Sequence, residues 1–513
     1  MDNKRETDVP AAACCLPPIR LSKPSSELPK PARGWIGALL TDYTQVDAHL
    51  DDWVSAHQEE IVAAAQGLLR IPSVKGEPAP DAPFGAETRR ALDYALQVAE
   101  TQGLTTKMLE GYVAHAEWAA PGVAPDAPIV GVLAHVDVVP AGDGWTSGPF
   151  DADIVNGRIV ARGAIDDKGP AIAGLFAIAA LKDCGASLTR RMRLILGADE
   201  ESGFGCVRYY FAHEEMPVTG FTPDADFPLV HAEKGIANAV LVGPAPPEGQ
   251  KIHIVRFEGG LRPNMVPDSA EALLDNVKTV QASLARLNGV VGIEAMETKG
   301  SSGQVRVAAR GVSAHGSTPE KGVNALSVLC DALLLLDHHE DQVDLIENLK
   351  TLAQDTTGAC LGIAGADAMA GPLTCNLGLA GYKSGQVTLT FNIRYPVTWN
   401  KAVLEDKLQV GIAGTRWTLQ ELTDQAPLYV PTDDLLAQTL LEVYRAETSD
   451  MRVPLTMGGG TYARAMTKGV AFGASFPGAN TPGPHEKNEA WAVTDLIRAT
   501  KIYAKALVRL GNQ

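Results

Sequence analysis

The sequence lacks three patterns, and each absence argues against a class of protein. Its seven cysteines include no Cys-x-x-Cys pair, which disfavours a thiolate zinc site or a disulfide framework and fits reduced, mostly buried thiols. No apolar run approaches the roughly 18 to 20 residues that span a bilayer. Bases are scarce, with 44 Lys and Arg against 61 Asp and Glu, and a net charge of −17 argues against nucleic-acid binding. We therefore expect a cytoplasmic protein with neither a membrane nor a nucleic acid as partner.

The N-terminal segment differs from the rest of the chain. Residues 1–40 contain six prolines and little periodic apolar pattern. Their charged opening, and an apolar stretch interrupted by Pro17-Pro18, are not typical of a signal peptide. We predict a flexible leader over residues 1–40, with a docked tail as the alternative.

From about residue 41 the chain has α/β character. Short apolar runs at 129–133 and 192–196 predict buried strands, and helical spacing of apolar residues at 53–69, 87–102 and 169–181 predicts helices. Strands that alternate with helices indicate an α/β sheet covered on both faces.

The pattern changes after about residue 235, where apolar and polar residues alternate as in strands with one face in water. The alternating segments are 253–257, 304–307 and 386–394, and the segments with helical spacing are 268–287, 322–337 and 400–409. Helical spacing returns near 432–446 and 492–509. We therefore predict an α+β domain with an antiparallel sheet over residues 236–425, inserted between two parts of an α/β domain, 41–235 and 426–513.

Histidines and carboxylates follow the predicted strands, lie in loops before predicted helices or, in the case of Asp224, lie in a turn after a short helical stretch. They occur in His135-Val-Asp137, Asp166-Asp167, Asp199-Glu200-Glu201, Asp224 and Pro484-His485. Each alone has a simpler explanation, such as a helix cap, a solvated acidic loop or a turn. Because loops at the carboxyl edge of an open α/β sheet converge on one crevice, we expect these side chains to gather there.

The expected cluster suits metal ions. It offers nitrogen and oxygen ligands but no thiolate, a set that fits two zinc ions, with cobalt or manganese as possible substitutes. Five ligands are too many for one tetrahedral zinc, whereas two ions that share a carboxylate would use all of them. The five candidates are His135, Asp166, Glu201, Asp224 and His485. Asp137 lies two residues beyond His135 and can therefore reach the histidine ring from the same side of an extended segment.

Four longer motifs carry a resemblance to a known family. They are HVDVVPAGDGW at 135–145, RGAIDDKG at 162–169, DEESG at 199–203 and FTPDADFP at 221–228. The chain resembles, from about residue 50 to its C-terminus, the zinc exopeptidases and deacylases that include aminoacylase, carboxypeptidase G, succinyl-diaminopimelate desuccinylase and carnosinase. It is most similar to the bacterial PepV-type dipeptidases, although Ala134 stands where many relatives have glycine. The resemblance implies a zinc-exopeptidase-type three-layer α/β catalytic domain with an inserted α+β lid domain.

The resemblance also implies roles for the cluster. His135, Asp166 and Asp224 would hold one zinc, and Asp166, Glu201 and His485 the other, so that Asp166 bridges the two ions. Asp137 would orient His135. Glu200 would be the general base that takes a proton from the metal-bound water.

Residues of the lid and of a glycine-rich loop resemble the substrate-binding elements of the dipeptidases. His315 would assist zinc in stabilising the oxyanion, with an ordinary turn histidine as the alternative. Asn264 would contact the substrate near the scissile bond, and Arg394 would pair with a substrate carboxylate, in a bidentate manner. The loop would offer backbone N–H groups to the same carboxylate. Its residues are Gly458, Gly459, Gly460 and Thr461.

We therefore predict a dizinc dipeptidase that acts on small unblocked dipeptides. An N-acyl-amino-acid amidohydrolase of the same family is the alternative. The lid of about 190 residues is longer than in deacylases, where a partner subunit supplies the histidine, so we expect a monomer, with a homodimer as the alternative. A non-catalytic protein of this fold is disfavoured, because Glu200 and every expected ligand are present.

Overall fold

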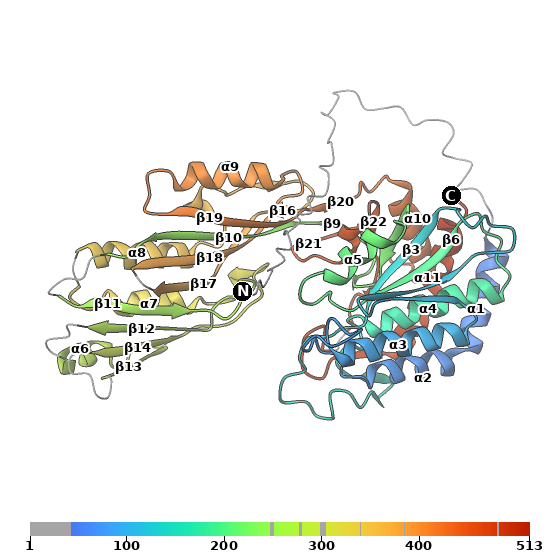
Figure 1. Cartoon of the computed structure of the whole chain (residues 1–513), viewed down its shortest axis with the longest axis horizontal. Coiled ribbons are helices and arrows are strands. Elements are labelled where there is room, and N and C mark those ends of the chain that lie inside the picture. Colours follow the sequence, from blue (N-terminus) through green and yellow to red (C-terminus); the bar gives the residue numbers. More distant parts are fainter. Residues whose placement is uncertain are drawn as a thin grey trace, which may run out of the picture. The chain divides into compact units, whose positions relative to one another are not determined.

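Two large β-sheets organise residues 45–513, which form one unit (Figure 1). This computed structural model describes residues 43–246, 251–275, 280–297, 304–338, 340–383, 385–479 and 482–513. The predicted leader, residues 1–40, lies outside the described residues.

The first sheet has the strand order β1-β2-β6-β3-β7-β22-β9-β20, with β21 beside β9. At its centre β6 (Arg191–Gly197), β3 (Ile129–His135) and β7 (Thr219–Thr222) run parallel, and every residue in them is buried. Full burial is expected of parallel strands covered on both faces, so the two strands predicted from apolar runs are confirmed. The outer strands are β1 (Thr105–Leu109), β2 (Val113–Trp118), β9 (Val230–Glu233), β20 (Leu428–Tyr429), β21 (Leu455–Met457) and β22 (Gly469–Ala471).

Helices cover this sheet on both faces. α4 (Lys168–Asp183) connects β3 to β6, and α5 (Gly205–His213) connects β6 to β7 on the other side of β3. Because both crossovers are expected to be right-handed and they run in opposite directions, their helices lie on opposite faces. Figure 1 shows α4 beside α11, the last helix. The predicted three-layer α/β architecture is therefore confirmed.

The other helices of this domain are α1 (Thr44–Ala56), α2 (Gln58–Leu69), α3 (Ala86–Thr101), α10 (Leu435–Thr448) and α11 (Val493–Leu510), with a 3-10 turn at Tyr462–Ala465. The single helix predicted over 53–69 is interrupted at His57 and belongs to α1 and α2. Three short strands form a small sheet, β4 (Asp153–Val155), β5 (Arg158–Val160) and β24 (Ala490–Ala492), and β8 (Ala225–Asp226) pairs with β23 (Ala474–Ser475).

The second sheet is antiparallel throughout and has the order β13-β14-β12-β11-β17-β18-β10-β19. Along the sequence, the first strand of this sheet is β10 (Gly235–Pro244) and the last is β19 (Thr418–Gln425). The predicted α+β domain with an antiparallel sheet is therefore confirmed. The remaining strands are β11 (His253–Gly259), β12 (Ser269–Asp275), β13 (Ile293–Glu297), β14 (Val305–Arg310), β17 (Thr374–Lys383) and β18 (Gln386–Tyr395).

Burial alternates along β10, and the inward residues of this sheet share one apolar core with its helices. These helices are α6 (Val280–Leu287), α7 (Ala325–Leu333), α8 (Glu340–Gln354) and α9 (Lys401–Ile412), with 3-10 turns at Pro319–Lys321 and Ala359–Leu361 and a small sheet of β15 (Ala366–Asp367) and β16 (Gly371–Pro372).

The helix predicted over 268–287 is wrong in its first half. Ser269–Asp275 is strand β12, and only Val280–Leu287 is helical. The segment SAEALLD is rich in good helix formers, but its alternate residues are buried and it pairs with both β11 and β14. Tertiary pairing overrides the local helix propensity here.

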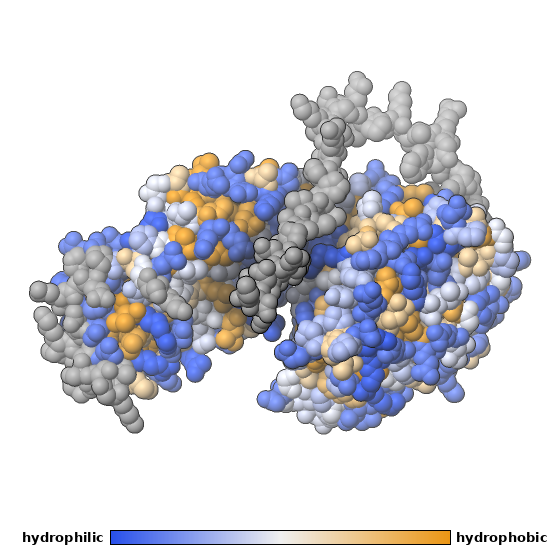
Figure 2. Space-filling view, in the orientation of Figure 1, coloured by the Kyte–Doolittle hydropathy of each residue, from blue (hydrophilic) through white to orange (hydrophobic). Residues whose placement is uncertain are grey.

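The surface agrees with a buried apolar core. Figure 2 shows mostly hydrophilic residues on the visible face, with apolar residues in separate patches. Among the described residues, every helix is too short or too polar to cross a membrane. The five described cysteines are free, and Cys206, Cys330 and Cys375 are buried.

Candidate active site

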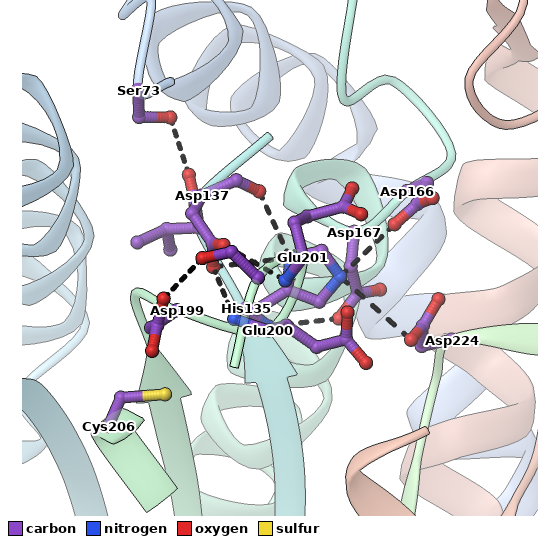
Figure 3. A network of polar contacts seen from close by, with 12 residues as sticks. Ser73, His135, Asp137, Asp166, Asp167, Asp199, Glu200, Glu201, Cys206 and Asp224 are labelled. Atoms are coloured by element: carbon purple, nitrogen blue, oxygen red, sulfur yellow. Dashed lines mark hydrogen bonds and ion pairs between the residues drawn. The ribbon is translucent and has the colours of Figure 1, made fainter. Parts of the chain in front are cut away.

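Three parallel strands of the first sheet end at one crevice (Figure 3). His135 is the last residue of β3, Glu200 and Glu201 follow β6, and Asp224 follows β7. Strand order brings these ends together, because β6 and β7 flank β3. Asp224 thus comes directly after a buried strand and not, as predicted, after a helical stretch.

Two further residues reach the same crevice from loops. Asp166 lies in the turn before α4, and His485 lies in the loop before β24. The Asp166 carboxylate has one oxygen beside each histidine: Oδ1 is 3.1 Å from Nε2 of His135, and Oδ2 is 3.1 Å from Nε2 of His485. A carboxylate that bridges two metal ions must offer one oxygen to each ion, as Asp166 can here.

The five predicted ligands form two groups that share Asp166. Ligand atoms of His135, Asp166 and Asp224 lie within 4.8 Å of one another, and so do those of Asp166, Glu201 and His485. Asp224 Oδ2 is 3.9 Å from Nε2 of His135, and Glu201 Oε2 is 3.2 Å from Nε2 of His485. The groups coincide with the two ligand sets implied by the resemblance.

The donor atoms fit metal ions. Nδ1 of His135 lies 3.0 Å from the backbone carbonyl oxygen of Asp137 and donates to it, which leaves the lone pair on Nε2. That Nε2 atom is buried and makes no well-formed hydrogen bond among the described residues, and it faces the Asp166 carboxylate at 3.1 Å. Nitrogen and oxygen donors without a thiolate are typical of zinc, cobalt or manganese sites.

The Asp137 side chain lies beside the His135 ring and also holds the next loop. Its Oδ1 is 3.6 Å from Nδ1 of His135, within ion-pair range, and the Asp137 backbone carbonyl lies closer to the same nitrogen, at 3.0 Å. The carboxylate accepts hydrogen bonds from the backbone N–H groups of Glu200 (3.1 Å) and Glu201 (3.2 Å). Asp137 therefore fixes the turn that presents both glutamates.

The carboxylates of the crevice destabilise one another's charge. Burial, and then the negative charges of Glu201 and Asp166, raise the pKa of Glu200 well above its usual value, against the opposing effect of His135. Burial and the charge of Asp166 likewise raise the pKa of Asp224. Hydrogen bonds to Asp166 and Glu201 raise the pKa of His485 to about 11. Such crowding of acids is typical of a site built for cations.

A cavity of about 680 Å³ joins the metal-ligand cluster to the inserted domain. Glu200 lines it beside four of the predicted ligands, and six polar residues of the inserted domain line it as well. Those six are Asn238, Asn264, His315, Asn392, Arg394 and Gln425. Glu200 and His315, two of the predicted catalytic residues, therefore share one space with the predicted substrate-binding side chains of the inserted domain.

His315 presents a hydrogen-bond donor to this cavity. Its Nδ1 accepts from the backbone N–H of Ser317 (3.3 Å) and lies 2.6 Å from the Ser317 hydroxyl, so the ring proton resides on Nε2. Desolvation, followed by the positive charges of Arg394 and His485, lowers the pKa of His315 to about 4, and the ring is neutral. The Gly316 N–H donates to the carbonyl of Asn264, which holds the two predicted lid residues side by side.

Arg394 is a buried cation at the cavity wall, with 4% of its surface exposed. Its Nε donates to Asn392 Oδ1 and its Nη1 to the Gly458 carbonyl, each at 2.9 Å. Burial, together with the charge of Arg464, lowers its pKa to about 10. Among the described residues Arg394 forms no ion pair with a carboxylate. Asn392 was missed, although its position two residues before Arg394 in an alternating strand places it on the same face.

The glycine-rich loop departs in part from prediction. Gly459 and Gly460 line the cavity, but Gly458 offers its carbonyl to Arg394. The Thr461 N–H donates to Oε2 of the buried Glu233 (3.1 Å), and its hydroxyl donates to Oε1 (2.6 Å). Thr461 therefore anchors the loop, and its N–H is not the expected donor to a substrate.

Comparison with known proteins identifies the family. Residues 131–509 match the model of peptidase family M20/M25/M40. The chain belongs to this family. The Bacillus subtilis protein named "Putative dipeptidase YtjP" is 42% identical over 473 residues, which cover 89% of this chain and 98% of that relative. "Putative dipeptidase SH1171" of Staphylococcus haemolyticus is 35% identical over 467 residues, with the same coverage of 89% and 98%.

Solved structures show the same fold. Human carnosine dipeptidase 1 aligns with a TM-score of 0.50 at 15% identity, over 91% of this chain and 99% of its own. The Saccharomyces cerevisiae di-peptidase Dug1p aligns with a TM-score of 0.53 at 14% identity, over 91% and 98%. The chain is a metallopeptidase of the M20 family, and the predicted resemblance is confirmed.

Proposed function

We propose that the chain is a dipeptidase that cleaves the peptide bond of unblocked dipeptides. It uses two zinc ions, for which cobalt or manganese can substitute. One observation carries the proposal. A single cavity holds the Asp166-centred ligand cluster and, on the wall formed by the inserted domain, the buried guanidinium of Arg394, which pairs with no carboxylate among the described residues. A short substrate with a free carboxylate matches that pair of features.

The residues around the cavity take distinct roles in this proposal. His135, Asp166, Glu201, Asp224 and His485 would hold the ions. When bound, the two ions would lower the pKa of a water molecule and polarise the scissile carbonyl. Glu200 takes a proton from the attacking water and passes it to the leaving amine.

The inserted domain, residues 236–425 in this proposal, supplies the contacts that surround the scissile bond. The Nε2–H of His315 donates to the oxyanion, where a preorganised donor is most effective. Asn264 lies beside His315, and Arg394 binds the substrate carboxylate together with the N–H groups of Gly459 and Gly460. Because His315 and Glu200 of one chain line one cavity, we propose a monomer with a complete site.

A substrate panel tests this function. Metal-free protein would be reloaded with zinc, cobalt or manganese and assayed with a free dipeptide, its N-acetyl form, and the corresponding N-acetyl amino acid. We expect metal-dependent cleavage of the free dipeptide with the highest kcat/KM of the three. A higher kcat/KM for the N-acetyl amino acid would reject the dipeptidase and favour a deacylase.

A further inference from the structure

A buried ion pair lies behind the ligand cluster, where three loops meet. Arg162 and Glu489 are 2% and 0% exposed, and Nη1 of the arginine lies 2.7 Å from Oε2 of the glutamate. The two residues are 327 positions apart in the sequence. Neither side chain lines the cavity, so neither touches a substrate.

Glu489 organises the turn that carries the bridging aspartate. Its Oε2 also accepts from the Gly163 N–H (3.1 Å), and its Oε1 accepts from the N–H groups of Ile165 (3.0 Å) and Asp166 (3.3 Å). Each carboxylate oxygen therefore accepts two hydrogen bonds, and three of the four come from backbone N–H groups within residues 163–166. Charged acceptors of this kind bind backbone donors more strongly than neutral ones do.

Arg162 extends the connection to the loop of His485. Its Nη2 donates to the His485 carbonyl at 3.2 Å and to the Ala141 carbonyl at 3.4 Å. The guanidinium carbon also lies 5.3 Å from the centre of the Trp145 ring, in the loop that follows β3. One buried cation thus contacts the loop after His135, the loop of His485 and, through Glu489, the turn of Asp166.

The two ligand groups depend on these loops to different degrees. His135 ends a buried central strand and its side chain is 1% exposed, whereas the His485 side chain is 56% exposed and belongs to a loop. The separation between Asp166 and His485 is set by backbone that the ion pair holds at both ends. The Asp166/Glu201/His485 group therefore relies on the pair more than the His135/Asp166/Asp224 group does.

We propose that Arg162 and Glu489 are positioning residues that hold Asp166 and His485 at the spacing needed by the second ion. The inference rests on the proposed two-ion function. Its consequence is selective: loss of the pair weakens the ion of the His485 group and largely spares the ion of the His135 group.

Substitution of Glu489 tests the inference with little change in size. In Glu489→Gln the amide nitrogen must face backbone or guanidinium donors, so at least one set of hydrogen bonds is lost. We expect the His485-group ion to bind about 10- to 100-fold more weakly, the scale for losing a residue that supports a ligand. Dialysis against a metal concentration at which the wild type keeps two ions per chain would then leave about one ion per chain of Glu489→Gln. Arg162→Lys keeps the charge but cannot reach Glu489 and His485 together, and should recover part of the loss seen in Arg162→Ala.

The readouts are metal content by mass spectrometry, chelator competition for each ion, and the absorption spectrum of the cobalt-loaded protein. Glu117→Gln is the matched control, because Glu117 pairs with the buried Arg193 on β6, at the end remote from Glu200. Thermal unfolding of the metal-free proteins shows how much stability each variant loses. The control should lose stability but keep both ions.

Three results would overturn the inference. One is a folded Glu489→Gln protein that binds both ions as tightly as the wild type. Another is equal weakening of both ions, and the third is the same metal loss in Glu117→Gln. A wild type that binds fewer than two ions would refute the two-ion function itself, and this inference with it, so the two failures are distinguishable.

Discussion

The cation at Arg394 predicts a strong preference for substrates with a free carboxylate. Its guanidinium is 4% exposed and donates through Nε and Nη1 to Asn392 and Gly458. Neither contact uses Nη2, so Nη2 is the nitrogen that would meet a substrate. A charge-assisted hydrogen bond contributes about 1.5–3 kcal/mol, which corresponds to about 10- to 150-fold in kcat/KM.

The assay compares a free dipeptide with its C-terminal amide, in the wild type and in Arg394→Ala. We expect the wild type to favour the free dipeptide by about 10- to 150-fold and the variant to lose most of that preference. The substitution also leaves Asn392 Oδ1 and the Gly458 carbonyl without their donor, which should slow both substrates. The ratio between substrates removes this shared loss, as in a double-mutant cycle.

Arg394→Lys separates charge from geometry, because a lysine ammonium cannot donate to Asn392, Gly458 and a carboxylate in the same arrangement. It should retain a reduced preference. If the wild type hydrolyses both substrates equally, or if Arg394→Ala keeps the full preference, the carboxylate contact lies elsewhere and the reasoning from burial is wrong.

Three other substitutions test the remaining roles. Glu200→Gln should keep both ions, as measured by metal analysis, and lower kcat by about 10²- to 10⁴-fold, and near-normal turnover would reject Glu200 as the base. Asp166→Ala should lose both ions together, because its two oxygens face the two histidines, and a variant that still held two equivalents would place the bridge elsewhere. His315→Ala should slow free and amidated dipeptides by the same factor, since its partner is the oxyanion common to both, and a change in their ratio would contradict that role.

The metal-ligand cluster was predictable because it depends on strand ends. The apolar runs before His135 and Glu200 marked two buried parallel strands, and the polar residues after them had to meet at one edge of the sheet. Strand β7 is only four residues long, too short for a clear apolar pattern, so Asp224 was assigned to the cluster without its strand. His485 follows no strand of this kind, and its only local signal was a place in the loop before the last predicted helix.

The contacts that support the ligands were not predictable in the same way. Asp137 was expected from sequence spacing to orient His135 with its carboxylate, but spacing did not show that the Asp137 backbone carbonyl contacts the same ring nitrogen or that the carboxylate also holds the backbone of Glu200. Thr461 belongs to a loop whose glycines indicated anion binding, yet its donors serve Glu233, which lies 228 residues away. Arg162 and Glu489 are likewise brought together only by the tertiary fold.

The two halves of the site come from different domains, and a second buried ion pair joins them. All predicted metal ligands belong to the first domain, whereas Asn264, His315 and Arg394 belong to the inserted one. Arg464 pairs with Glu233 at 2.9 Å and donates to the carbonyls of Lys234 and Ala426, next to the points where the chain enters and leaves the inserted domain.

Arg464 also donates to the Gly459 carbonyl at 3.1 Å, and the adjacent Gly458 carbonyl accepts from Arg394. The glycine-rich loop is therefore fixed by one arginine to both chain crossings and by another to the sheet of the inserted domain. The same contacts fix the position of this loop beside the metal ligands and the position of Arg394. The junction between the two domains therefore sets the distance between the proposed binding site of the substrate carboxylate and the scissile bond. In the proposed function, that dependence restricts the length of substrate between its carboxylate and its scissile bond.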